Sequence, residues 1–123
     1  MIDLSNLFKL RQQLHDAITS KNIQILKRLL DNVNFINLNY VDKEGQTPLH
    51  RSCRLGNLKI VELLCEHGAS QMIINRDGWF PIHLAAYYGN IHIVSYLLKQ
   101  QQTKQNENKN DELLVFNFSK LKI

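Results

Sequence analysis

Residues 42–57 read DKEGQTPLHRSCRLGN, and residues 75–90 read NRDGWFPIHLAAYYGN. The two stretches share both glycines, the proline, one histidine and the closing Gly-Asn pair at a constant spacing of 33 residues. Six of the seven Gly and Pro residues of the chain fall into these pairs, and such residues fix unusual or rigid backbone. A period in this range predicts a solenoid, which usually serves as a binding surface without chemistry of its own.

Each unit reads as a turn followed by two helices. In the first copy, residues 42–45 have the composition of a turn. Thr47 suits the N-cap of a helix, and Pro48 suits its first position, where the missing N–H costs nothing. Gly56 can end this helix, after about Leu55, by taking the left-handed conformation. A second helix is indicated by apolar residues at helical spacing ahead of Gly68, namely Ile60, Val61, Leu64 and Cys65.

The repeat divides the chain into four segments. Residues 42–74 form the second repeat and residues 75–98 the third, whose last helix is expected over 91–98. Residues 1–41 contain a divergent copy that lacks Gly and Pro, begins its first helix early and carries two extra residues in its connector. These features are typical of an N-terminal capping repeat.

The fourth segment, residues 99–123, falls into two parts. Residues 99–112 contain no apolar side chain and are rich in Gln, Asn and Lys, so we expect a disordered linker there. Residues 113–123 are apolar again. Because the third repeat shows no polar cap, its last helix should leave apolar surface open. Three alternatives are open. Residues 113–123 fold back over this surface, or a partner protein covers it and completes the stack, or residues 113–123 are a linear motif that binds another protein.

Charge and composition exclude several classes of function. The net charge is +4, but residues 1–41 and 99–123 each carry five basic and three acidic side chains, while residues 42–98 carry five of each. This distribution lacks the basic stripe of a direct nucleic-acid binder. No membrane span or secretory signal is visible. The two cysteines, Cys53 and Cys65, fit a reducing compartment, so we expect the chain in the cytoplasm or the nucleus. We also expect a monomer when no partner is bound.

The strings TPLH at 47–50 and GWFPIHLAA at 78–86, each followed by Gly-Asn, Ile-Val and Leu-Leu, resemble ankyrin repeats. The resemblance implies an all-α ankyrin-repeat solenoid of three helix–turn–helix repeats with β-turn fingers. It implies no catalytic activity and no cofactor, and a protein partner that docks on the fingers and the concave helix surface. It also implies a hydrogen-bonding role between repeats for the recurring histidines, which explains them better than a metal site: His15, His50 and His83.

A narrower resemblance concerns one family within this class. Three repeats in a short chain, a lengthened connector before EGQT at 44–47, and NRDGW at 75–79 are similar to the Notch-regulated ankyrin repeat proteins. This resemblance implies a small nuclear regulator of Notch-type transcription complexes, able to stack on another ankyrin domain through its C-terminal end. Pro48, Pro81 and the long polar tail depart from that family's pattern. A function of a different class remains open, namely a targeting or inhibitory subunit of an enzyme such as a phosphatase or ubiquitin ligase.

Four aromatic residues are the main candidates for partner contacts. Trp79 occupies the finger position of Gln46, which is itself a candidate for partner contacts. Tyr87 and Tyr88 end the first helix of the third repeat, so we expect all three rings to face solvent on the concave side. Exposed aromatic side chains commonly anchor interfaces, although these could instead pack on the neighbouring repeat or the tail. Phe80 replaces a capping Thr at a cost of about 1 kcal/mol, which marks either a functional position or a gap filler.

Basic residues share the face of these aromatics. They either steer an acidic partner or form an ordinary solvated surface: Lys43, Arg51, Arg54 and Arg76. Asn39 precedes Gly45 by six residues, which is the ankyrin position that asparagine hydroxylases can modify. The sequence contains no phosphate loop, nucleophile elbow, zinc-protease helix or metal-ligand cluster, so no catalytic site is predicted.

Overall fold

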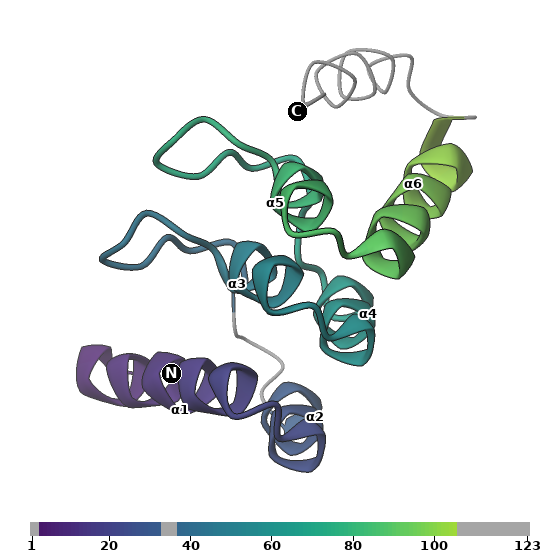
Figure 1. Ribbon diagram of the computed structural model, residues 1–123. Helices are drawn as coiled ribbons and strands as arrows, with labels where there is room; N and C mark the ends of the chain where they lie inside the picture. The colour runs from purple at the N-terminus through teal and green to yellow at the C-terminus, as the bar shows by residue number, and fades with distance from the viewer. Residues whose placement is uncertain (1–2, 33–36, 106–123) are drawn as a thin grey trace.

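The computed structural model describes residues 3–32 and 37–105 of the chain. Within these ranges it contains six helices and no strand, as the sequence predicted. Figure 1 shows them stacked as three antiparallel pairs. The helices are α1 (Leu4–Thr19), α2 (Ile23–Asn32), α3 (Pro48–Leu55), α4 (Leu58–Glu66), α5 (Pro81–Tyr87) and α6 (Ile91–Gln105).

The stack has two layers of helices. Helices α1, α3 and α5 form one layer, in which each packs on the next, and α2, α4 and α6 form the other (Figure 1). The loops before α3 and α5 project side by side from the first layer as two fingers. This arrangement confirms the predicted all-α solenoid of three helix–turn–helix repeats. No helix in the described part of the chain is long and apolar enough to span a bilayer.

Each finger is shaped by one short polar side chain. The Asp42 carboxylate accepts the backbone N–H groups of Glu44 at 2.8 Å and Gln46 at 3.1 Å. The Asp42 N–H in turn donates to the carbonyl of Gln46 at 2.9 Å, which closes the loop. Asn75 forms the same loop in the next finger, where its side-chain oxygen accepts two backbone N–H groups at 2.9 Å. The turn predicted from residues 42–45 is confirmed.

One histidine joins the second repeat to the third. Thr47 caps α3, because its hydroxyl accepts the His50 backbone N–H at 3.2 Å. The ring nitrogen Nδ1 of His50 accepts the Thr47 backbone N–H at 3.3 Å, so the ring proton lies on Nε2. His50 Nε2–H then donates to the carbonyl of Trp79 at 2.8 Å, across the repeat boundary. The histidine bridge that the ankyrin resemblance implies is therefore present.

Two further contacts close the same boundary. The Arg76 N–H donates to the Gly45 carbonyl at 2.9 Å, which ties finger to finger. The Asn90 side-chain amide donates to the Cys53 carbonyl at 2.6 Å, which ties the helix ends together. The first repeat follows the same plan with other residues: Lys21 takes the left-handed conformation, with φ 57°, that Gly56 and Gly89 adopt in the later copies.

The third repeat ends later than the sequence suggested. We expected the last helix to stop at Leu98 and a disordered linker to follow, but α6 continues to Gln105. Gln101 is only 3% exposed and donates to the Gln71 side-chain oxygen at 2.8 Å, while Gln71 donates to the Leu97 carbonyl at 3.3 Å. Gln and Lys are also good helix formers. The linker prediction is therefore wrong for residues 99–105, whereas residues 106–123 lie outside the described residues.

Two glycines at equivalent finger positions predict different mutational costs. Gly45 and Gly78 both have a positive φ, at 76° and 81°. A Cβ on Gly45 would lie 2.3 Å from the Cβ of Arg76, whereas a Cβ on Gly78 would meet nothing within 4 Å. We expect Gly78→Ala to cost about 1–2 kcal/mol of left-handed strain and Gly45→Ala about 1–3 kcal/mol more from overlap. Urea denaturation followed by circular dichroism measures both, and equal losses would contradict the stacked-finger geometry.

Buried histidines predict a loss of stability on acidification. Burial lowers the pKa of His50, although the bond to the Trp79 carbonyl opposes this shift, and burial also lowers the pKa of His83. Below the ordinary histidine pKa of 6.5, the unfolded chain binds protons that the folded chain does not. The free energy of unfolding should therefore fall as pH drops below about 6.5, by at most about 1.4 kcal/mol per pH unit and histidine.

Urea titrations at neutral pH and about one and two pH units lower test this expectation. Asp42 does not contribute in this window. Burial alone would raise its pKa, but hydrogen bonds from Arg51 and the finger backbone outweigh burial and hold the pKa below 3.8. The variant His50→Gln should show a shallower pH dependence than the wild type. A stability that is flat or rises on acidification would refute the assignment of buried neutral rings.

Candidate functional site

Three aromatic rings and one guanidinium meet at the end of α5. The Trp79 and Tyr87 ring centroids lie 5.5 Å apart and those of Tyr87 and Tyr88 lie 5.1 Å apart, both near edge-to-face geometry. The Arg54 guanidinium from α3 lies 5.5 Å from the Tyr88 ring centroid. Such contacts hold the side chains in one arrangement before any partner arrives. We call these four residues the aromatic cluster.

The exposure of the cluster agrees with the sequence prediction only in part. Tyr87 is 52% exposed and Tyr88 is 46% exposed, as expected for the end of the helix. Trp79 is half-buried instead of facing solvent freely, because its ring lies edge-on to Tyr87 and to His83, at 6.3 Å from the latter. We expected the Trp79 ring to face solvent as the two tyrosines do, whereas it presents only part of its surface.

Phe80 fills space instead of presenting a surface. It sits at the N-cap of α5, where no side-chain cap forms, and its backbone N–H donates to His83 Nδ1 at 3.1 Å. Its ring is half-buried against the hydrophobic core, and its centroid lies 5.5 Å from that of His83. These contacts favour the gap-filling alternative.

The basic residues that share this face have different roles. Arg51 is half-buried, and its guanidinium contacts Asp42 at 2.6 Å and Glu44 at 3.5 Å, so it stabilises the first finger. The other three are exposed, with Lys43 and Arg76 on the two fingers. The third, Arg54, belongs to the aromatic cluster.

Two polar residues of the predicted sites link neighbouring repeats. Gln46 is half-buried, and its side-chain oxygen accepts the Asn75 amide at 3.1 Å, so it joins the two fingers. Asn39, the candidate for hydroxylation, is exposed. Its side-chain oxygen accepts the Ser70 backbone N–H at 2.8 Å, so the side chain is held across the stack.

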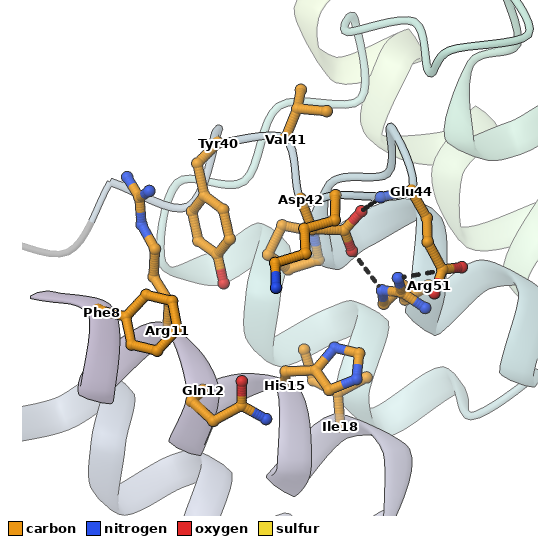
Figure 2. A pocket seen from close by; sticks show the side chains of 12 residues that line it. Phe8, Arg11, Gln12, His15, Ile18, Tyr40, Val41, Asp42, Glu44 and Arg51 are labelled. Carbon is orange, nitrogen blue, oxygen red and sulfur yellow. Dashed lines mark hydrogen bonds and ion pairs between the residues drawn. The ribbon is translucent and has the colours of Figure 1, made fainter.

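The sequence did not reveal a pocket of about 370 Å³ between α1 and the first finger. Figure 2 shows Tyr40 directed into it from the connector, with Arg11 beside the Tyr40 ring and Phe8 below on α1. Tyr40 and Val41 carry the only sequence signal, because apolar residues directly before a turn must pack against some neighbour. The pocket is lined by Phe8, Arg11, Gln12, His15, Ile18, Tyr40, Val41, Asp42, Lys43, Glu44, Pro48 and Arg51.

The C-terminal end of the stack carries an unused hydrogen-bond donor. His83 occupies the position of His50 one repeat later, and its Nδ1 likewise accepts a backbone N–H. The ring is only 6% exposed, and its Nε2 is buried without an acceptor among the residues that the structure describes. In His50 the same atom reaches the finger of the following repeat. Elsewhere in the described ranges, no three His, Cys, Asp or Glu side chains group as metal ligands.

Comparisons with known proteins agree with this geometry. A family model described as "Ankyrin repeats (3 copies)" matches residues 14–111. A putative ankyrin repeat protein of fowlpox virus is 46% identical over 46% of this chain and 38% of its own length. The human Notch-regulated ankyrin repeat-containing protein is 44% identical over 50% of this chain and 55% of its own length. A mouse serine/threonine-protein kinase is 38% identical over 56% of this chain, which is 8% of the kinase. The chain thus spans about half the length of these relatives or less.

Proposed function

The chain belongs to the ankyrin-repeat family, whose repeats are protein–protein interaction modules, and we propose that it is a small regulator of a Notch-type transcription complex. The similarity to the human Notch-regulated ankyrin repeat-containing protein supports the choice of pathway. The match covers 55% of that relative, so the pathway is part of the proposal. The same proposal places the chain in the nucleus or the cytoplasm.

The aromatic cluster is the observation that carries the proposed contact surface. Two tyrosines at about half exposure, braced by Trp79 and Arg54, have few conformations to lose when a partner covers them. Tyr, Trp and Arg are also the residues that most often dominate binding energy. Lys43 and Arg76, exposed on the fingers beside this cluster, supply positive charge that favours an acidic partner.

The open end of the stack supports a second contact with the same complex. His83 Nε2–H is buried and has no acceptor among residues 3–32 and 37–105, and such a donor costs free energy unless an acceptor reaches it. In the stack itself that acceptor is the carbonyl of the next finger, Trp79 for His50. We therefore propose that an ankyrin finger of the partner supplies the carbonyl for His83, and that two ankyrin domains stack end to end.

The proposed role is non-catalytic. The repeats of this family generally act as interaction modules, and the similarity to the mouse kinase covers only 8% of that enzyme. The alternative of an enzyme-targeting or inhibitory subunit uses the same concave surface, so the identity of the bound partner separates the two.

A retention experiment tests the aromatic cluster. Nuclear and cytosolic extracts are passed over the immobilised wild type, over Trp79→Ala/Tyr87→Ala/Tyr88→Ala, and over Ile25→Ala. The last variant removes an apolar side chain, 42% exposed, from α2 of the first repeat, whereas the cluster lies on the second and third repeats. We expect mass spectrometry to find subunits of a Notch-type transcription complex on the wild type and the control. They should be lost from the triple variant, with circular dichroism confirming that each bait is folded.

Two outcomes would contradict parts of this proposal. Retention of the same partners by all three baits would mean that the aromatic cluster does not bind them. Retention of a phosphatase or ubiquitin ligase that disappears with the aromatics would keep the surface and replace the Notch assignment with the enzyme-subunit alternative.

Nuclear magnetic resonance of the histidine rings tests the stacked end. In the free chain, the Nε2–H of His50 should be protected from exchange, because it is bonded to the Trp79 carbonyl. The Nε2–H of His83 should become protected only when the purified complex is added. If His83 is protected in the free chain, and loses protection when residues 106–123 are deleted, the tail covers this end and the stacking proposal fails.

A further inference from the structure

The pocket between α1 and the first finger lies away from the aromatic cluster, on the first two repeats. Its volume of about 370 Å³ suits one or two side chains of a ligand. In Figure 2, Phe8 and Arg11 extend from α1, Tyr40 descends from the connector beside Arg11, and Val41 points upward at the outer edge of the pocket. Ile18 contributes to the floor. The pocket therefore has an apolar floor, and the Arg11 and Tyr40 side chains in its walls end in polar groups.

Two hydrogen-bond donors in the pocket have no acceptor. The Arg11 guanidinium lies 4.2 Å from the centroid of the Tyr40 ring, and its Nε is buried without a partner in the part of the chain that the structure describes. The Tyr40 hydroxyl points into the pocket in Figure 2 and makes no hydrogen bond to a described residue. Burial raises the pKa of Tyr40 to about 12, so the phenol stays protonated at neutral pH and can donate.

The charges of the pocket leave a cationic excess. Asp42 and Glu44 are engaged by Arg51, at 2.6 Å and 3.5 Å. Arg11 and Lys43 have no carboxylate partner within the described ranges. The carboxylates of Asp42 and Glu44 are already bonded to Arg51. The remaining donors and the charges of Arg11 and Lys43 are therefore complementary to an anionic group of a ligand.

The residues at the rim of the pocket favour a peptide over a small anion as the ligand. Phe8 is 65% exposed and Val41 is 52% exposed, and Leu4, one helical turn before Phe8, is 84% exposed. An apolar strip therefore leads out of the pocket along α1, beyond the reach of an inorganic anion. A chain that carries an acidic side chain next to an apolar one matches both the donors and the strip.

We propose that this pocket binds a short acidic segment of a partner protein. A Glu or Asp carboxylate accepts hydrogen bonds from the Arg11 guanidinium and the Tyr40 hydroxyl, and Lys43 adds electrostatic attraction. A neighbouring apolar side chain of the segment packs on Phe8 and Val41. The inference rests on the proposed function in taking the ligand to be a protein, but its pocket shares only Lys43 with the surface proposed above, and it names the chemistry recognised there.

Fluorescence polarisation with the full chain tests the pocket. The probe is a short fluorescein-labelled peptide with a central Glu-Leu-Phe-Glu in a Gly-Ser background. Matched peptides replace both Glu residues by Gln, or Leu and Phe by Ser. We expect the parent peptide to bind, and each replacement to weaken binding at least about fivefold. Binding should also weaken as salt is raised, because attraction by Lys43 is screened.

Conservative variants locate the binding to these atoms. Tyr40→Phe keeps the ring under Arg11 and removes only the hydroxyl, and we expect roughly tenfold weaker binding. Arg11→Lys keeps the charge, removes Nε and should have a similar effect. Lys59→Gln removes an exposed charge from α4 outside the pocket and should bind as the wild type does. Equal urea midpoints of wild type and variants show that the fold is unchanged.

Three results would overturn the proposal: no binding of the parent peptide, binding that Tyr40→Phe and Arg11→Lys leave unchanged, or binding that requires a phosphoserine in place of Glu. Each is separable from failure of the proposed function, which is read from retention on the aromatic-cluster variant. Loss of partners with that variant but no peptide binding keeps the proposed function and removes the pocket. The reverse pattern keeps the pocket and removes the aromatic surface.

Discussion

The hydrogen bond from His50 Nε2 to the Trp79 carbonyl organises the middle of this molecule. A pair of short helices cannot bury its apolar face alone, so each repeat depends on its neighbour. A fully buried imidazole is tolerated in this boundary because both ring nitrogens are bonded, one to Thr47 and the other to Trp79. The same bond fixes the backbone of Trp79, whose ring anchors the aromatic cluster. This contact therefore contributes both to the stability of the stack and to the shape of its surface.

Local backbone rules made most of the fold predictable. Thr47, Pro48 and Gly56 mark the ends of α3, and the helix runs over Pro48–Leu55 as those residues indicated. The end of α6 was missed because it depends on an amide pair between Gln71 and Gln101, which are 30 residues apart. Periodicity within a polar stretch gives no sign of such a partner, so the composition was interpreted as a disordered linker.

The candidate surfaces were predictable in position but not in detail. The repeat frame placed Tyr87 and Tyr88 at an exposed helix end, where the structure has them. The repeat frame could not show that Trp79 packs against two neighbouring rings or that Arg51 forms an ion pair with Asp42, because these contacts depend on side-chain geometry. The pocket was missed for the same reason, since Tyr40 and Arg11 meet only when α1 has docked on the connector.

The two boundaries of the stack are joined in different ways. Repeats two and three share backbone and side-chain bonds. The first repeat meets the second through apolar packing, an exposed contact between His67 and Asp31 at 3.1 Å, and the bond from the Ser70 N–H to the connector residue Asn39 at 2.8 Å. Local opening in a quasi-one-dimensional protein follows its least cooperative joint. Amide hydrogens of α1 and α2 should therefore exchange through partial unfolding that leaves α3 to α6 intact. A ligand that bridges Arg11 of α1 and Lys43 of the first finger spans this joint, so its occupancy would set how often the first repeat detaches.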